Sequence, residues 1–223
     1  MYEYVGARKN DVLKNSNEFY VDDVCYKIAS TPSVILQYYE LLENIGQDYI
    51  SKDFIVTAQE QLINNLYGKI IVAINSDGIL LGGARLILST PENRCLLPLE
   101  SSSFKLESLF PHMNLKNKIY AEWGRFIVHP GVPNKKRISE NIARMCIIQS
   151  YKLNAAYLFG MPILCMKNRY EQIFSNMRLN FTPLLSCSEI PRYTIAPNVD
   201  FYLAVTDLNF SEQLEDIVEN YIS

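Results

Sequence analysis

Short apolar runs alternate with helix-length amphipathic segments along most of the chain. Glu18–Ala29 (EFYVDDVCYKIA) mixes aromatic and β-branched residues, which predicts a first strand. The sequence TPS at residues 31–33 opens a run with helical apolar spacing, which predicts a helix ending at Gly46. A second helix is predicted over Phe54–Leu66.

The next apolar runs indicate a β-hairpin followed by a loop and a buried strand. The hairpin is predicted within Lys69–Thr90, because Asn75–Gly78 (NSDG) separates its two apolar halves with turn residues. Asn93–Lys118 has weak periodicity, which predicts a loop with short helical pieces. Tyr120–Pro130 (YAEWGRFIVHP) follows as a strand, which HPGVP at residues 129–133 ends.

Helix and strand patterns alternate over the remainder. The predicted elements are a helix at Lys135–Lys152, a strand at Ala155–Phe159, a helix at Lys167–Met177, a strand at Asp200–Val205 and a helix at Phe210–Ile222. This order predicts one α/β domain over residues 1–223, with a mixed central sheet flanked by helices. The strand-helix-strand unit within Tyr120–Gly160 is expected to be parallel and right-handed.

Composition and charge exclude several classes of protein. The chain is 48% hydrophobic and 20% charged, as globular domains are, and its net charge of −3 gives no basic footprint for nucleic acid. The amino-terminal residues lack the apolar core of a signal peptide, and no apolar run approaches the length of a membrane span. We therefore expect a cytoplasmic protein with no nucleic-acid partner and no membrane span.

The cysteines and histidines do not predict a metal site. The five cysteines are scattered, odd in number and without a CxxC pair, and the chain has only two histidines. Reduced thiols, several of them in the core, are expected at Cys25, Cys95, Cys146, Cys165 and Cys187.

Charged residues occur within two apolar strands. Glu122 and Arg125 precede a short apolar run, and two opposite charges in a buried strand are costly unless they are paired or used in chemistry. They form either a structural ion pair or the working end of an active site. Strict alternation places Trp123 and Arg125 on the face opposite Glu122, unless a bulge at Gly124 re-aims Arg125. Arg85, in the strand ARLIL, is either a partner for Glu122 or for a substrate carboxylate, or an edge-strand residue with an exposed head.

These two strands resemble those of the acyl-homoserine-lactone synthases, the autoinducer synthases of quorum sensing. That family has a G-x-x-R-L strand, which GGARL at residues 82–86 matches. It also has an E-[LIV]-[ST]-R-[FL]-x-[VI] strand, which EWGRFIV at residues 122–128 matches at its Glu, Arg, Phe and Val. The family shares its fold with the GNAT N-acyltransferases and the N-acyl amino acid synthases. The resemblance covers roughly residues 71–180.

The resemblance implies transfer of a fatty acyl group from a thioester to the amine of a small acceptor. Glu122 would be the general base that deprotonates the amine, directly or through water. Arg125 would orient Glu122 or the substrate carboxylate. A backbone N–H of Phe126, Ile127 or Val128 would hold the carbonyl oxygen of the acyl group.

The acyl donor is predicted from the segment after the second strand. The sequence VPNKKRIS at residues 132–139 lacks the glycine-rich pyrophosphate loop of GNAT enzymes. Lys135, Lys136 and Arg137 begin a helix, where they could contact a phosphopantetheine or an acidic carrier protein. Autoinducer synthases also lack that loop and take their acyl group from acyl carrier protein. This favours acyl carrier protein as donor, with acyl-CoA as the other candidate and no tightly bound cofactor.

Several positions depart from the resemblance. Gly124 stands where the autoinducer synthases have Ser or Thr. Their S-adenosylmethionine segment carries an Arg, a Trp and an acidic cluster, whereas here Trp123 is the only Trp and QDYISKDF at residues 47–54 is a loose version of the cluster. Phe174 occupies the place where GNAT enzymes often have a general-acid Tyr, and Tyr170, one turn earlier, is expected to pack. The sequence supports acyl transfer better than it supports S-adenosylmethionine as co-substrate.

The same residues also have purely structural interpretations. Aromatic and sulfur-containing residues that could line an acyl-chain tunnel are more often core, and the core interpretation is favoured for Tyr151, Tyr157, Phe159, Met161 and Met166. His129 is expected to be an ordinary loop residue rather than a base. At the level of the whole protein, a module that binds an acyl ligand or carrier protein without catalysis is the alternative to an enzyme. An acetyl-CoA-dependent acetyltransferase is a weaker one.

Overall fold

A mixed eight-stranded sheet organises the described part of the chain, residues 18–49, 68–190 and 200–209 of this computed structural model. The strands follow the order β1-β2-β3-β4-β5-β6-β8-β7, and only β5 and β6 pair in parallel. Their bounds are β1 Glu18–Val21, β2 Val24–Ile28, β3 Gly68–Asn75, β4 Leu80–Ser89, β5 Tyr120–Val128, β6 Tyr157–Gly160, β7 Thr182–Ser186 and β8 Tyr202–Asp207.

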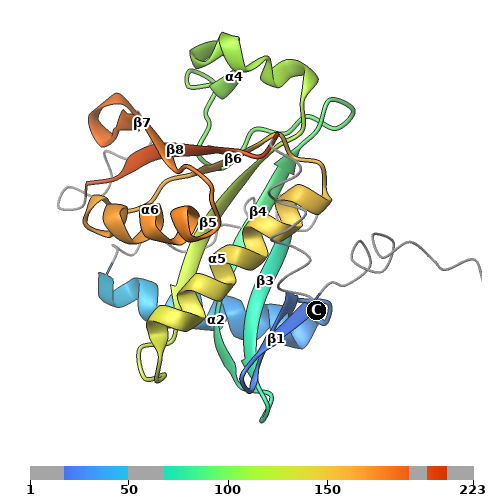
Figure 1. The fold of residues 1–223 in the computed structure, drawn as a ribbon, viewed down its shortest axis with the longest axis vertical. Helices are drawn as coiled ribbons and strands as arrows, with labels where there is room; N and C mark the ends of the chain where they lie inside the picture. The colour runs from blue at the N-terminus through green and yellow to red at the C-terminus, as the bar shows by residue number, and fades with distance from the viewer. Residues whose placement is uncertain (1–17, 50–67, 191–199, 210–223) are drawn as a thin grey trace, which may run out of the picture.

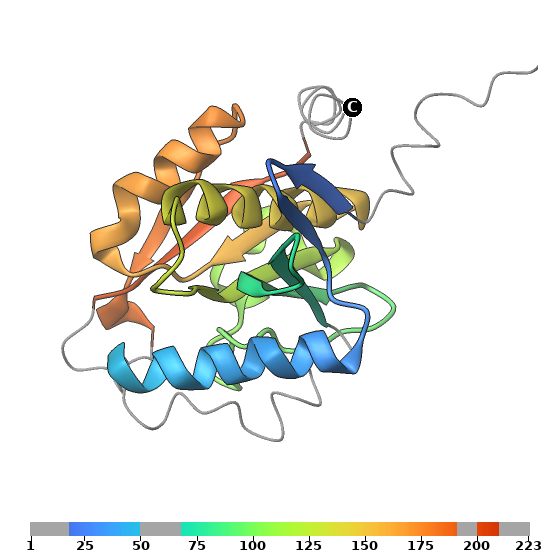
Figure 2. The ribbon, with the colours of Figure 1, turned by 90° about the horizontal axis from the view of Figure 1, so that it is seen from below.

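Helices cover both faces of this sheet. Their bounds are α2 Pro32–Tyr49, α4 Leu106–Leu109, α5 Lys135–Lys152 and α6 Lys167–Asn176, with short 3-10 turns at Pro111–Met113, Leu115–Asn117, Leu164–Met166 and Cys187–Glu189. Helix α5 crosses the middle strands in Figure 1. Figure 2 shows α2 on one side of the sheet and α5 with α6 on the other. The predicted α/β class with a mixed sheet flanked by helices is confirmed.

Two consecutive glycines allow a helix to approach each face of β4. A Cβ added to Gly82 would lie 3.2 Å from Cδ1 of Ile142 in α5, and one added to Gly83 would lie 2.8 Å from the ring of Tyr38 in α2. Neighbouring residues of a strand face opposite sides of the sheet. Larger residues at these positions would therefore push the helices away on both sides.

Apolar residues of the described chain pack in three clusters, one of which lies between the sheet and helices α5 and α6. The residues considered for an acyl-chain tunnel divide between two of them. Tyr151 and Met166 pack against the α5 cluster, whereas Tyr157, Phe159 and Met161 belong to the cluster around Leu97–Leu115. This division favours the core interpretation over a tunnel lined by all of these residues.

Some predicted boundaries were wrong for identifiable reasons. The single strand over Glu18–Ala29 is a hairpin, because Asp22 adopts a left-handed φ of 53° and turns the chain between β1 and β2. Helix α2 does not stop at Gly46 but continues to Tyr49. β7 was not predicted, since its sequence TPLLS is short and contains a proline, as an edge strand can.

Other predictions agree with the structure. The β3–β4 hairpin turns at the predicted NSDG sequence, β5 and β6 are parallel, and α5 has the predicted bounds. Residues 106–117 form the short helical pieces expected in the loop before β5. The predicted strands before Gly160 and near Val205 are displaced by about two residues. The helices predicted at 54–66 and 210–222 lie outside the described residues.

Candidate active site

A β-bulge divides β5 into two parts. Gly83 pairs with Ile127 and Arg85 with Gly124, so Arg125 and Phe126 together stand opposite one residue of β4. Arg125 takes a left-handed φ of 52° to accommodate the extra residue. The bulge changes which face the following side chains occupy. The sequence allowed a bulge at Gly124 that would interrupt strict alternation. The structure has this bulge directly after Gly124.

A tyrosine of α2 holds the bulge in place. The hydroxyl of Tyr38 donates a hydrogen bond to the backbone carbonyl of Arg125 over 2.7 Å, and the Tyr38 side chain is fully buried. Burial raises the pKa of Tyr38, so its hydroxyl stays a donor. The sequence did not point to Tyr38, because in a helical pattern it resembles any other buried aromatic residue.

Replacing Tyr38 by phenylalanine tests this anchor. The change leaves the ring in place and removes the hydroxyl that donates to the Arg125 carbonyl. We expect the free energy of unfolding in urea to fall by about 1–2 kcal/mol, because a partly buried carbonyl loses this donor. Tyr20→Phe is the matched control, since Tyr20 is 65% exposed. Equal losses in the two variants would contradict the anchoring role.

Beyond the bulge, β5 separates from β6. Their parallel pairing runs from Tyr120 with Tyr157 to Trp123 with Gly160 and ends there, although β5 continues to Val128. The N–H of His129 donates to the Leu81 carbonyl of β4. Because N–H groups alternate in direction along a strand, the N–H of Val128 faces the side from which β6 has departed. This leaves a strand edge with hydrogen-bonding groups at a place where the sheet opens.

A buried ion pair lies on the α2 side of the same strands. Nη2 of Arg85 lies 3.5 Å from Oε1 of Glu122, and the two residues are only 3% and 5% exposed. The N–H of Leu99 donates to the other carboxylate oxygen of Glu122 over 2.8 Å. The interpretation of Arg85 as an exposed edge-strand residue is wrong, because β4 is an interior strand and Arg85 is buried. Arg85 instead contacts Glu122 across adjacent strands.

Gly124 leaves space beside this ion pair. Among the described residues, a Cβ at Gly124 would have only two atoms within 4 Å, Oε1 of Glu122 at 3.1 Å and Nη2 of Arg85 at 3.7 Å. Gly124 itself is half-buried. Among those residues, a small ligand group above Gly124 would therefore lie close to both charges. A Ser or Thr at this position would fill part of that space.

A second buried carboxylate, Glu100, shapes the loop that reaches Glu122. Its two oxygens accept the N–H groups of Leu97 and Leu106 over 2.9 and 2.8 Å. The loop held in this way places the Leu99 N–H on Glu122. Burial and the nearby carboxylates raise the pKa of the Cys95 thiol to about 11, so this thiol stays protonated at neutral pH. Sequence reasoning missed Glu100, because neither periodicity nor a motif marks it.

Burial of Glu100 makes the free energy of unfolding depend on pH. Burial raises its pKa above the ordinary value of 4.5, so from pH 4.5 upward the folded protein holds a proton that the unfolded chain releases. This contribution makes the free energy of unfolding decrease as the pH rises from 4.5. We expect Glu100→Gln to remove that part of the dependence, measured by urea unfolding at several pH values. Identical pH profiles for the variant and the wild type would contradict it.

Comparison with known proteins defines the fold that carries this site. No protein-family model matches the chain, and no curated protein matches it. FeeM, an N-acyl amino acid synthase from uncultured soil microbes, superposes with a TM-score of 0.61 at 12% identity, over 84% of this chain and 92% of that one. A GNAT-family acetyltransferase from Staphylococcus aureus Mu50 gives 0.51 at 16% identity, over 82% and 99%. The chain has the GNAT fold.

A further match is BjaI, a CoA-dependent acyl-homoserine lactone synthase solved with MTA. It superposes with a TM-score of 0.51 at 16% identity, over 86% of this chain and 82% of that one. The resemblance predicted from the two charged strands is thus confirmed at the level of the fold, and identities this low establish no more than the fold.

On the face of β5 opposite Glu122, Trp123 packs in the hydrophobic core. Trp123 is 4% exposed and meets the rings of Tyr170 and Phe174 of α6 at centroid distances of 5.2 and 5.7 Å. Trp123 therefore lies on the face opposite Glu122, and Tyr170 packs, both as predicted. His129 accepts the N–H of Gly131 on its own Nδ1, as a turn residue does.

Two of the three basic residues at the start of α5 lie near carboxylates. Nη1 of Arg137 lies 2.7 Å from Oδ2 of Asp22 in the β1–β2 turn, and Nζ of Lys136 lies 4.0 Å from Oε1 of Glu140. Asn134 precedes the helix with a left-handed φ of 56° and no side-chain cap. Lys135 and Lys136 begin the next helix after the open end of β5, with six residues between the two elements. Their predicted contacts with a donor remain predictions.

Neither a metal cluster nor a membrane-spanning helix occurs in the part of the chain that the structure describes. Those residues contain no group of three or more His, Cys, Asp or Glu side chains that could hold a metal ion. Within the same residues, no helix has the length and apolar character needed to cross a membrane.

Proposed function

We propose that this protein is an N-acyltransferase, which moves an acyl group from a thioester to the amine of a small acceptor. The observation that carries the proposal is the opening between β5 and β6 beyond Trp123 and Gly160, with the N–H of Val128 on the opened edge. The buried pair of Glu122 and Arg85 on the same strands supplies the second feature that the reaction needs.

The reaction assigns a role to each part of the site. The acceptor nitrogen attacks the thioester carbonyl, its proton passes to Glu122 directly or through water, and the C–S bond breaks to release a thiolate. The Phe126–Val128 segment offers backbone N–H groups for the carbonyl oxygen. Arg125 and Arg85 orient Glu122 or an acceptor carboxylate. A thiolate leaves without an acid, because the pKa of a thiol is about 8.5.

Both candidate donors carry phosphopantetheine, and the start of α5 is the proposed place for it. Lys135 and Lys136 follow the open end of β5, where they would bind the phosphate of acyl-CoA or of acyl carrier protein. Arg137 is the third basic residue proposed there, although it already pairs with Asp22. BjaI is a CoA-dependent enzyme, so acyl-CoA stands beside acyl carrier protein as donor.

The acceptor is proposed to be an amino acid or a related small amine. An acceptor above Gly124 would have its ammonium group near Glu122 and its carboxylate near Arg85, the two side chains closest to that position among the described residues. FeeM, which shares the fold, is an N-acyl amino acid synthase. S-adenosylmethionine, which would make the product a lactone autoinducer, is the second acceptor to test.

The direct test is incubation of the purified protein with acyl-CoA or acyl carrier protein donors and a panel of amines. Amide products are identified by mass spectrometry, and the donor that gives the higher rate is identified in the same assay. Calorimetry with S-adenosylmethionine tests the lactone branch separately. No amide with any donor or amine, together with tight binding of an acyl donor, would replace the enzyme by a non-catalytic acyl-binding module.

A further inference from the structure

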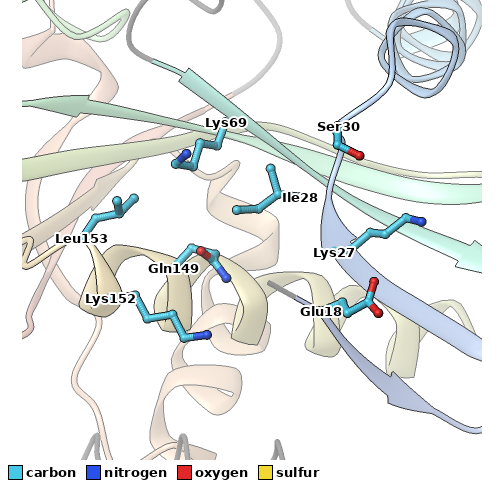
Figure 3. A pocket seen from close by; sticks show the side chains of 8 residues that line it. All are labelled: Glu18, Lys27, Ile28, Ser30, Lys69, Gln149, Lys152 and Leu153. Carbon is cyan, nitrogen blue, oxygen red and sulfur yellow. The ribbon is translucent and has the colours of Figure 1, made fainter. Parts of the chain in front are cut away.

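A cavity of about 440 Å³ lies away from the candidate active site, beside the last turns of α5. Its size falls in the range of small-molecule sites, roughly 300–1,000 Å³. Strands β1 to β3 and helix α5 supply its walls, and Figure 3 shows the side chains that line it. These are Glu18, Lys27, Ile28, Ser30, Lys69, Gln149, Lys152 and Leu153.

The described residues that line this cavity carry a net positive charge, in a protein whose net charge is −3. Three lysines and one glutamate are among these residues. In Figure 3, Lys69 of β3 and Lys152 of α5 lie with Gln149 on one side of the view, whereas Glu18 and Lys27 lie on the other. Two ammonium groups from different elements that border one cavity favour an anion between them.

A buried amide forms part of the same wall. Gln149 is 3% exposed, and its Nε2 contacts the sulfur of Met145, a weak acceptor, at 3.8 Å. Because the Met145 sulfur is a weak acceptor, the Gln149 amide can also form hydrogen bonds to a ligand in the cavity. Ile28 and Leu153 supply apolar surface beside it.

The carboxyl end of a helix disfavours an anion unless its carbonyls are occupied. At the end of α5, three of the last four carbonyls are occupied. The carbonyls of Gln149, Ser150 and Tyr151 accept the N–H groups of Leu153, Ala155 and Asn154. Burial also lowers the pKa of Lys152, because it disfavours the charged ammonium, and a bound anion would oppose that effect.

We propose that this cavity is a second ligand site, which binds a small organic anion through Lys69 and Lys152, with Gln149 as hydrogen-bonding partner. The anionic group is a carboxylate or a phosphate, and its partly apolar carrier contacts Ile28 and Leu153. The site is distinct from the acyl-transfer site, because it lies on the α5 side of the sheet whereas Glu122 and Arg85 lie on the α2 side. It does not depend on the proposed reaction.

Titration of the ¹⁵N-labelled full chain tests this site, with hexanoate, hexyl phosphate and inorganic phosphate as ligands and neutral hexanamide as control. We expect the side-chain amide signal of Gln149, identified with Gln149→Met, to shift with an anionic ligand. Lys69→Met and Lys152→Met should each weaken the affinity by about tenfold or more, as loss of a charge-assisted contact does. Which ligands bind then distinguishes a carboxylate from a phosphate.

Lys116→Met is the matched control, because Lys116 is exposed on the 3-10 turn before β5 and the substitution removes the same charge. Its affinity for the anion should equal that of the wild type. Thermal unfolding of each variant confirms that it is folded. Equal shifts with hexanamide, or unchanged binding in the Lys69→Met/Lys152→Met double variant, would overturn the proposal. Loss of acyl transfer alone would not bear on it.

Discussion

Replacing Glu122 by glutamine is expected to slow acyl transfer by about 10²–10⁴-fold, the range that a positioned general base contributes. Glutamine keeps the shape of the side chain and can still accept the Leu99 N–H, but it cannot take a proton from an ammonium. The rate of amide formation under saturating donor and acceptor measures the effect. Full activity of the variant would remove Glu122 from the mechanism.

The same change removes one charge of a buried pair, so stability must be separated from catalysis. Removing one partner of a buried ion pair costs about 3–5 kcal/mol, and the double variant Arg85→Met/Glu122→Gln should recover part of this loss without restoring activity. Glu100→Gln is the matched control, because Glu100 is also buried and accepts two backbone N–H groups nearby. It should lose stability, but its activity while folded should fall much less than that of Glu122→Gln, because Glu100 only positions the loop beside Glu122. Equal loss of activity in both glutamine variants would point to damage to the loop instead.

Substituting Gly160 by alanine is expected to disturb the point where β5 and β6 separate. A Cβ there would lie 2.1 Å from Nε1 and 2.7 Å from Cδ1 of Trp123, so the indole must move. Overpacking of this kind costs about 1–3 kcal/mol of the free energy of unfolding. Trp123 is the only tryptophan, so its fluorescence reports the change without interference. We expect emission at longer wavelength as the ring leaves its buried position.

The control for this change is Gly131→Ala. A Cβ at Gly131 would meet only the ring of His129, at 3.3 and 3.4 Å among the described atoms, and that ring can move. Its emission and stability should stay close to those of the wild type. In the Gly160→Ala background, Trp123→Phe should recover stability, because it removes the part of the indole that clashes. Unchanged emission in Gly160→Ala would contradict the close approach of Trp123 and Gly160.

Much of the fold could be predicted from local patterns. Residues 135–152 show helical spacing from a clear start to a clear end, and the NSDG turn fixed the β3–β4 hairpin. The β1–β2 hairpin was missed because its turn contains two aspartates, which also suit an exposed strand face. Helix α2 passed its expected glycine stop because a single glycine within a helix costs only about 1 kcal/mol relative to alanine, which makes it a weak stop signal.

Less of the candidate site was predictable, because its contacts join distant parts of the chain. Glu122 and Arg85 stood out as charges in apolar strands, and alternation placed Trp123 on the other face. The donor to Glu122, however, is the backbone N–H of Leu99, which no side-chain pattern reveals. The role of Tyr38 could not be predicted from the sequence either. Its hydroxyl reaches the bulge only because the Tyr38 ring packs over Gly83.

The bond from Tyr38 to Arg125 has a consequence for how the chain could be shortened. It links residues 87 positions apart, so the shape of β5 depends on a helix made before the central hairpin. A fragment starting at Gly68 would contain Glu122, Arg85 and both separating strands, yet it would lack the Tyr38 hydroxyl that holds the bulge. Contacts of such long sequence separation form late in folding, because the intervening loop must first be closed. The smallest unit that can assemble this site therefore begins no later than α2.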